Sequence, residues 1–268
     1  MIWGQLEVAV EETGEALPLA WRAAQDLAKE LHSVDPNTAS VTWLNHSSVL
    51  RADWDSLAKI DYIGIDGTLL ELVLRICGLP VRRTSADMFG PLLLKLAVGK
   101  RVALVGGAPG VARAAADRIG RDIVLALDGY RELDGMRTDP SVIVDAAPDV
   151  VVLGLGAGVQ DRVLCELREH LPGAIIMTAG GWLDQLGKKE QYFPAWVHLL
   201  RMGWLLRVIR EPRRLLRRYT IEALVFLKRA PRLVRILSSS HNLRPNGTAL
   251  GPSAAVPGPA MTRHAETA

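Results

Sequence analysis

Short apolar runs alternate with helical segments along most of the chain, and this alternation narrows the fold more than any other feature. Runs typical of buried strands lie at residues 40–44, 62–65, 101–105, 123–127, 150–153 and 174–178. Segments with helical spacing of apolar residues lie between them, at 67–77, 86–97, 111–119, 142–146 and 162–170. Strand, crossover helix and strand, repeated in this way, predict an α/β fold with a parallel sheet covered by helices on both faces. Such sheets bind ligands beyond the carboxyl ends of their strands.

The composition indicates what kind of protein this is and in which cellular compartment it is expected. The chain has 268 residues, of which 49% are hydrophobic, so it is long enough to bury a core without disulfide support. Cys77 and Cys165 stand in apolar surroundings, and we predict free core thiols in a protein of a reducing compartment. The first ten residues include Glu7 and no basic run, and no apolar stretch reaches the ~20 residues that span a bilayer. We therefore expect a cytoplasmic protein without a signal peptide or a transmembrane helix.

Positive charge gathers near the C-terminus. Residues 201–235 hold eleven Lys and Arg against two Glu, a net charge of +9; the whole chain carries +3, so the remainder carries −6. Large apolar residues recur in the same segment at spacings of three and four, as amphipathic helices require, and Pro212 predicts the start of a second helix. This combination favours an anionic membrane surface as a partner. Packing on the chain's own core is one alternative; nucleic-acid binding is another, but no nucleic-acid motif is present and we expect no such partner.

Three parts of the chain follow from these patterns. We predict a globular core over residues 1–190 and basic amphipathic helices that bind membrane or lipid over residues 191–237. Residues 238–268 are mostly Ser, Pro, Gly, Ala, Thr and Asn, which leave little to bury, so we predict a disordered tail.

Two glycine-rich turns follow predicted strands. Gly106 and Gly107 come after the strand at 101–105, and Gly154 and Gly156 come after the strand at 150–153. Glycine lets backbone amides approach a phosphate at a helix N-terminus, so two such turns at one sheet edge predict a nucleotide-sized ligand. Gln160 is available there to bind a base or a sugar. A tight strand-to-helix connection explains each turn equally well, and the spacing is not the GxGxxG of nicotinamide sites.

Carboxylates supply the candidate chemistry. Asp66 follows the strand at 62–65, a position that suits a general base but also a helix N-cap. We expect Asp87 and Asp184 in loops of similar setting, and Arg82 and Arg83 stand close to Asp87 in sequence, where they are able to bind phosphate. The six histidines show no HxH or HxxxH spacing, and no DxD pair is present. We therefore expect no metal and no cofactor.

A series of ordered motifs carries a family resemblance. In the body of the chain they are residues 42–45 (TWLN), 65–67 (IDG), 83–88 (RTSADM), 105–110 (VGGAPG), 129–131 (GYR), 148–161 (PDVVVLGLGAGVQD) and 180–187 (GGWLDQLG). The closing set is residues 193–196 (FPAW), 203–207 (GWLLR), 211–215 (EPRRL) and 217–219 (RRY). This ordered set, which covers roughly residues 41–228, resembles the WecG/TagA/CpsF family of bacterial glycosyltransferases.

The resemblance implies a fold and a reaction. Members of this family have a Rossmann-like core, the arrangement called GT-E, and are metal-independent, inverting transferases. They move an N-acetylmannosamine-type or related sugar from a UDP donor to a polyprenyl-diphosphate-linked sugar in teichoic-acid, common-antigen or exopolysaccharide synthesis. The resemblance thus implies a UDP-sugar and a lipid-linked acceptor as partners, and a peripheral place on the inner face of the cell membrane. It leaves a homo-oligomer open.

The resemblance also implies roles for individual residues. Asp66 corresponds to the proposed general base, and Thr42 or Asn45 assists at the site together with Arg83. The expected donor-binding residues are Arg82, Asp87, Gly106, Gly107, Tyr130, Gly154, Gly156, Gln160 and Asp184. The expected lipid-binding residues are Arg207, Arg214, Arg217 and Arg218.

Three departures from the family pattern stand beside these expectations. The family's LG-PKQE reads LGAGVQD at residues 155–161, Ser85 replaces a glycine, and Gly203 stands where a carboxylate is usual. The identity of the donor therefore stays open. A non-catalytic membrane-associated scaffold of the same fold is the alternative function. A second alternative function is that of a nucleotide-dependent oxidoreductase or methyltransferase, which the absence of GxGxxG disfavours.

Overall fold

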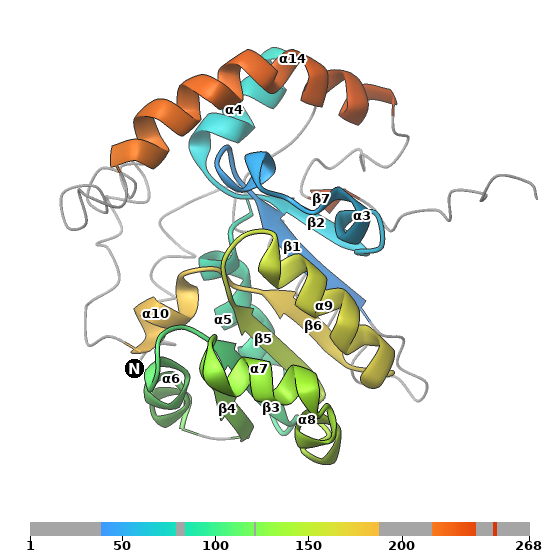
Figure 1. The fold of residues 1–268 in the computed structure, drawn as a ribbon, viewed down its shortest axis with the longest axis vertical. Helices are drawn as coiled ribbons and strands as arrows, with labels where there is room; N and C mark the ends of the chain where they lie inside the picture. Colours follow the sequence, from blue (N-terminus) through green and yellow to red (C-terminus); the bar gives the residue numbers. More distant parts are fainter. Residues whose placement is uncertain (1–38, 79–83, 121, 188–215, 240–248, 251–268) are drawn as a thin grey trace, which may run out of the picture.

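A parallel sheet forms the centre of the molecule (Figure 1). The computed structural model describes residues 39–78, 84–120, 122–187, 216–239 and 249–250. The parallel strands are β1 (Ala39–Leu44), β2 (Tyr62–Ile65), β3 (Val102–Gly106), β4 (Ile123–Leu127), β5 (Val150–Gly154) and β6 (Ile175–Thr178). The order across the sheet is β4-β3-β5-β6-β1-β2-β7, where the two-residue β7 (Ala249–Leu250) pairs antiparallel with β2. The predicted α/β fold with a Rossmann-like parallel sheet is confirmed.

The helices follow the predicted alternation with some additions. The predicted ones are α4 (Thr68–Ile76), α5 (Ala86–Leu96), α6 (Val111–Ile119), α8 (Ser141–Asp145) and α9 (Val159–His170). Those that the sequence patterns did not predict in the core are the 3-10 turn η1 (Ser48–Leu50), α3 (Trp54–Leu57), α7 (Arg131–Thr138) and α10 (Trp182–Gly187). Near the C-terminus, a π-helical turn η2 (Arg218–Glu222) leads into α14 (Ala223–Ser239). The additions in the core have at most eight residues, too few to show a clear helical period.

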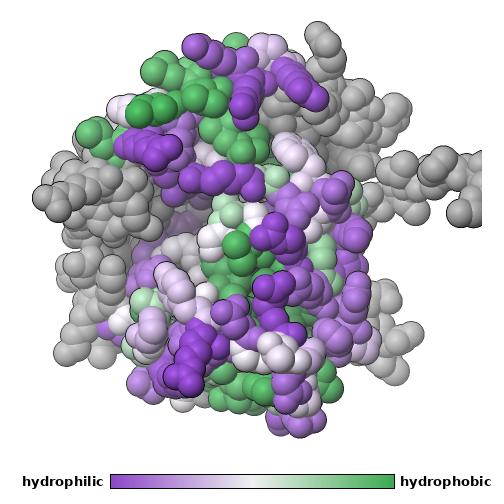
Figure 2. Space-filling view, viewed as in Figure 1, coloured by the Kyte–Doolittle hydropathy of each residue, from purple (hydrophilic) through white to green (hydrophobic). Residues whose placement is uncertain are grey.

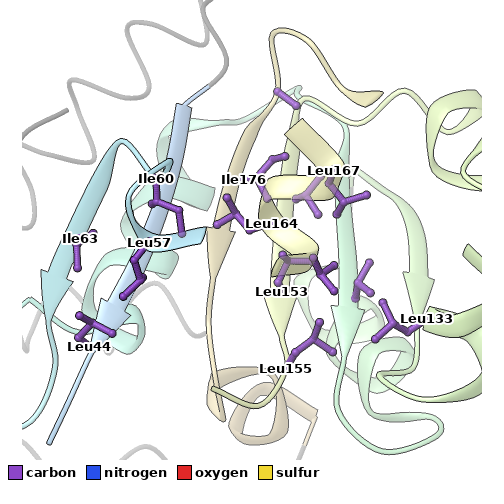
Figure 3. Close-up of a cluster of buried hydrophobic side chains, with 14 of the residues drawn as sticks. Leu44, Leu57, Ile60, Ile63, Leu133, Leu153, Leu155, Leu164, Leu167 and Ile176 are labelled. Carbon is purple, nitrogen blue, oxygen red and sulfur yellow. The ribbon is translucent and has the colours of Figure 1, made fainter. Parts of the chain in front are cut away.

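Helices cover the sheet on both faces. On one face α5, α6 and α10 pack against strand residues such as Leu104, Val152 and Met177. On the other face α3, α4, α7, α8, α9 and α14 share one core with the opposite side chains of the same strands. In Figure 3, Leu164 and Leu167 of α9 lie over this second face. Because both faces are covered, the inner strands β3, β5, β6 and β1 are buried along their whole length, whereas β4 at the edge of the sheet is half-buried.

The strand order reverses between β3 and β5. These two strands are neighbours, but β3 leads to β4 on one side and β5 leads to β6 on the other. In α/β sheets, ligands bind beyond the carboxyl ends of strands at such a reversal. Both glycine-rich turns follow the two strands that diverge here.

The sequence expectation for Cys77 is wrong, and other expectations lie outside the described residues. Cys77 is exposed and Cys165 is half-buried, so Cys77 is not a core thiol; it forms the C-cap of α4. The proposed helix start at Pro212, and residues 240–248 and 251–268 of the predicted tail, lie outside the described part of the chain. No helix among the described residues combines the length and the apolar character that crossing a bilayer needs.

Candidate active site

The glycine turns of β3 and β5 touch each other at the carboxyl edge of the sheet. The Gly107 amide donates to the Gly154 carbonyl oxygen at 3.0 Å. Gly106 has a φ of +143°, and a Cβ there would lie 2.3 Å from the same carbonyl oxygen; a Cβ on Gly107 would lie 2.5 Å from Val111. These approaches require glycine. At Gly156 a Cβ would meet nothing within 4 Å, so packing does not require glycine there.

The end of β4 lies against the first glycine turn. The Gly129 amide donates to the Gly107 carbonyl oxygen at 2.9 Å. Tyr130, the next residue, is 65% exposed, so its ring is free to stack on a flat ligand beside the turn. Asp128 is buried, and its Oδ1 accepts hydrogen bonds from the amides of Tyr130 at 2.8 Å and Glu132 at 3.2 Å. Sequence reasoning missed Asp128, although a carboxylate directly after a predicted strand is the signal that singled out Asp66.

Gln160 lies buried in the first turn of α9. This helix begins at Val159, three residues earlier than predicted, because Gly158 has a φ of +82° and forms the N-cap. Gln160 is 5% exposed, and no described residue donates a hydrogen bond to its Oε1. A buried acceptor without a donor costs about 1–3 kcal/mol. A ligand N–H or O–H at this position would remove that cost.

A buried hydrogen-bond chain joins β1, β6 and α9. The Thr42 hydroxyl donates to Asp161 Oδ1 at 2.9 Å and lies 2.8 Å from the Thr178 hydroxyl. All three side chains are at most 1% exposed. Burial raises the pKa of Asp161, and the hydrogen bond from Thr42 opposes that shift. Asp161 and Thr178 were not among the predicted site residues, and no local pattern in the sequence connects them to Thr42.

Asp66 lies at the carboxyl end of β2, beside the end of β1. The last residues of the two strands, Leu44 and Ile65, are paired, and the Asp66 amide donates to the Leu44 carbonyl oxygen at 2.7 Å. Gly67, not Asp66, occupies the N-cap position of α4. Asp66 is half-buried and so stands at the boundary between protein and solvent, as a base for an incoming hydroxyl must.

Asn45 stands next to Asp66 and shapes the loop after β1. Its side-chain oxygen accepts hydrogen bonds from the amides of Ser47 at 3.0 Å and Ser48 at 2.9 Å. A Cβ on Gly67 would lie 3.5 Å from the Asn45 Cβ. The structure therefore brings Asn45 and Asp66 together. Thr42 lies inside β1, two residues before the end of the strand, and is fully buried.

The sequence predicted Asp87 and Asp184 in loops, and this is wrong. They lie in the first turns of α5 and α10. A carboxylate in the first turn of a helix is stabilised by the helix dipole. The Thr84 amide donates to the Ile65 carbonyl oxygen at 2.9 Å, so α5 begins at the same edge as Asp66. α10 packs against α6, where a Cβ on Gly187 would lie 3.1 Å from the Val111 carbonyl oxygen.

Only part of the predicted arginine set lies within the described residues. Arg217 is exposed and Arg218 is half-buried on the helix that begins just before α14. The remaining predicted arginines, which lie outside the described part of the chain, are Arg82, Arg83, Arg207 and Arg214.

The loop after β1 is fastened to the C-terminal helix. His46 Nε2 lies 3.1 Å from the Arg218 carbonyl oxygen, and burial lowers the pKa of His46. Its ring packs near Tyr219 and Phe226, with centroids 5.5 and 6.3 Å away. Ser47 donates to Glu222 Oε2 at 2.6 Å. Sequence reasoning missed these contacts because the partners are more than 170 positions apart.

Fold and site together define a class of protein. The carboxyl edge of a Rossmann-like sheet carries two glycine turns, an exposed tyrosine, an unsatisfied amide and a half-buried carboxylate, which suits group transfer from a nucleotide-sized donor. Within the described part of the chain, no three acidic, histidine or cysteine side chains gather as a metal site requires. A sequence model of the Glycosyl transferase WecG/TagA/CpsF family matches residues 15–240, and the chain belongs to this family. The protein is a glycosyltransferase.

Several curated proteins are similar to the chain. A UDP-Gal:alpha-D-GlcNAc-diphosphoundecaprenol beta-1,4-galactosyltransferase of Shigella boydii is 24% identical over 185 residues, which is 64% of this chain and 77% of the relative. An N-acetylglucosaminyldiphosphoundecaprenol N-acetyl-beta-D-mannosaminyltransferase of Bacillus spizizenii is 28% identical over 166 residues, 59% of this chain and 64% of the relative. A protein of the same name from Bacillus subtilis strain 168 is 27% identical over 188 residues, 66% of this chain and 73% of the relative.

Proposed function

We propose that the protein transfers a hexose or N-acetylhexosamine, with inversion and without a metal, from a UDP-sugar to a sugar linked to polyprenyl diphosphate. The named relatives act on diphosphoundecaprenol-linked sugars, which supports a lipid-linked acceptor. One relative is named for UDP-galactose and two for N-acetylmannosamine transfer, so the sugar itself stays undecided between these types. The product would serve cell-surface polysaccharide synthesis.

The unsatisfied amide oxygen of Gln160 is the observation that carries the donor proposal. It is buried in the first turn of α9, directly after the glycine turn of β5, and the Gln160 backbone amide donates to the Gly156 carbonyl oxygen at 3.0 Å. A turn of this kind at a helix N-terminus suits a diphosphate. Tyr130 stands exposed beside the glycine turn of β3. A nucleoside diphosphate supplies what these groups lack: a flat base, N–H or O–H donors and phosphate oxygens.

Asp66 is the proposed general base. In this mechanism it takes the proton of the acceptor hydroxyl, the hydroxyl oxygen attacks the anomeric carbon, and the bond from that carbon to the UDP oxygen breaks. The negative charge that grows on UDP is stabilised by the backbone amides of the glycine turns and by Arg82 or Arg83. A single displacement of this kind inverts the anomeric configuration.

The C-terminal helices are proposed to hold the enzyme at the cytoplasmic face of the membrane. Arg207, Arg214, Arg217 and Arg218 would meet the lipid diphosphate there. Each basic residue near an anionic surface contributes about 1 kcal/mol of attraction. This proposal follows the three parts predicted from the sequence, with residues 191–237 as the lipid-binding part.

Calorimetric titration with UDP, in the presence of a chelator, tests the donor site. We expect saturable binding that Gln160→Ala weakens about tenfold, because one hydrogen bond to a desolvated amide is lost. Glu169→Ala is the matched control, since Glu169 is exposed near the end of the same helix, and it should bind UDP as the parent does. A folded parent protein that does not bind UDP would overturn the donor assignment, and a requirement for a divalent ion would overturn metal independence.

A further inference from the structure

Helices α4 and α14 carry large apolar side chains on their outer faces. On α4, Leu72 is 53% exposed and Ile76 is 75% exposed. On the C-terminal helix, Ile221 is 57%, Leu224 is 62% and Leu227 is 45% exposed. The two helices contact each other at one end of the molecule, and Figure 1 shows α14 running across that end beside α4.

These exposed residues are not part of the helix faces that pack on the core. Leu70 and Leu74 of α4, and Phe226 and Ala230 of α14, are at most 6% exposed and belong to the same hydrophobic core. Each helix therefore has apolar side chains on the face that packs on the core and further apolar side chains on its solvent-exposed face. Exposed apolar side chains gathered on two helices that contact each other indicate a surface that meets another apolar phase.

The exposed charges on the same two elements are all positive. Arg75 on α4 is exposed, as are the following residues of the C-terminal helix: Arg217, Lys228, Arg229 and Arg232. The acidic residues of these described elements are withdrawn from the surface. Glu71 is 3% exposed, and Glu222 is engaged by Ser47 and Arg51. Figure 2 shows apolar and hydrophilic side chains intermixed over the α14 end of the molecule.

We propose that α4 and α14 form one composite face that docks on an anionic phospholipid bilayer, with α4 as a membrane-contacting element of the catalytic core itself. We call this the α4–α14 face; it consists of Leu72, Arg75, Ile76, Arg217, Ile221, Leu224, Leu227, Lys228, Arg229 and Arg232. Apolar side chains interleaved with cations match the interface between headgroups and acyl chains. A nucleic-acid backbone would use the cations but leave the leucines and isoleucines in water.

The position of α4 gives this face a role in the proposed reaction, and to that extent the inference rests on the proposed function. α4 starts at Thr68, two residues after Asp66, and its nine residues are about 14 Å long. The two residues from Asp66 to Thr68 add at most about 7 Å, so docking through α4 keeps Asp66 within about 20 Å of the bilayer surface. That placement suits an acceptor whose diphosphate stays at the headgroup level while its lipid remains in the membrane.

Vesicle co-sedimentation of the full chain tests the proposal with paired variants. The probes are vesicles of phosphatidylcholine alone and of phosphatidylcholine with phosphatidylglycerol. Leu72→Ser/Ile76→Ser removes the apolar part of α4, and Leu224→Ser/Leu227→Ser removes that of α14. Val142→Ser/Val144→Ser is the matched control, because these valines of α8 are 40% and 42% exposed at the opposite end of the molecule (Figure 1).

We expect the parent and the α8 control to bind the anionic vesicles and not the neutral ones. Each of the other two variants should lose at least about tenfold in affinity, which corresponds to about 1.4 kcal/mol. Normal vesicle binding by the α4 variant would overturn the composite face, even if the α14 variant fails. A lower molecular mass in solution for either variant, with unchanged vesicle binding, would show that the face joins two copies and would also overturn it. UDP titration of the same variants separates this result from the proposed function, because donor binding should be unchanged.

Discussion

The hydroxyl of Ser47 donates a hydrogen bond to Glu222 Oε2 at 2.6 Å and so ties the loop after β1 to the C-terminal helix. Arg51 donates to the same carboxylate oxygen at 2.7 Å. The loop that holds Asn45 beside Asp66 is therefore supported by the helix that carries the α4–α14 face. The proposed lipid-docking face and the proposed site therefore share one set of contacts.

Removing the Glu222 carboxylate should loosen this connection. In Glu222→Ala we expect unfolding to become easier by about 1–2 kcal/mol, because Ser47 and Arg51 both lose their partner. Faster amide hydrogen exchange should appear in residues 45–51 and 216–239 together. Glu166→Ala breaks an ion pair with Arg137 in which both side chains are more than 40% exposed, and should change stability by less than about 0.5 kcal/mol. Equal exchange in the parent and Glu222→Ala would contradict the coupling.

Stability should fall in mild acid because of His46. Burial holds the pKa of His46 below its ordinary value of 6.5, although the Arg218 carbonyl, Glu222 and Asp66 oppose that shift. Below about pH 6.5 the unfolded chain takes up a proton that the folded chain refuses, so the free energy of unfolding decreases as pH falls. Urea unfolding at pH 7.5 and 5.5 measures this loss. His46→Gln should show a smaller loss between the two pH values than the parent; an identical loss would refute the assignment.

Asp66→Asn should abolish most of the transfer activity without affecting the donor site. A lost general base costs about 10²-fold or more in kcat. UDP affinity should stay within about twofold, since the base acts on the acceptor. Asp55→Asn, an exposed carboxylate in the first turn of α3, is the control and should keep full activity. Near-parental activity of Asp66→Asn would exclude it as the base.

Alanine at two glycines of the site should have opposite outcomes. In Gly106→Ala the new Cβ would meet the Gly154 carbonyl oxygen at 2.3 Å, at a φ of +143° that alanine rarely adopts. We expect a loss of about 3 kcal/mol or more in unfolding free energy. In Gly156→Ala nothing lies within 4 Å, and stability should change by less than about 0.5 kcal/mol. Thermal unfolding of the Gly106→Ala and Gly156→Ala variants measures this difference in stability. Equal melting temperatures for the two variants would contradict the close contact at Gly106.

Thr42 is expected to act through packing and hydrogen bonding rather than on the substrate. Thr42→Val removes the hydroxyl that donates to Asp161, and this should destabilise the protein by about 1–3 kcal/mol because a buried carboxylate loses a donor. Thr42→Ser keeps the hydroxyl and should restore most of the stability and activity. If Thr42→Val lowers kcat sharply while its melting temperature stays parental, Thr42 belongs to the catalytic machinery instead.

The sequence by itself determined the sheet, the order of its strands along the chain and the turns that carry the glycines. Apolar runs and helical spacing are local patterns, so β1–β6 and the longer core helices could be predicted to within a few residues. The glycine turn at Gly106 was predicted as well, but its close approach to the Gly154 carbonyl oxygen is known only from the structure. The first turn of α9 was misplaced by three residues, since the φ of Gly158 cannot be read from its neighbours.

Only the tertiary structure decided which side chains meet. The hydrogen bond from Thr42 joins it to Asp161, 119 positions away, and Ser47 meets Glu222 across 175 positions. Burial of Gln160 and exposure of Leu72 and Ile76 likewise depend on which helices cover the sheet and which faces they leave open. Local sequence patterns carry no distance information over such separations. The packing of helices on the sheet therefore determines these contacts.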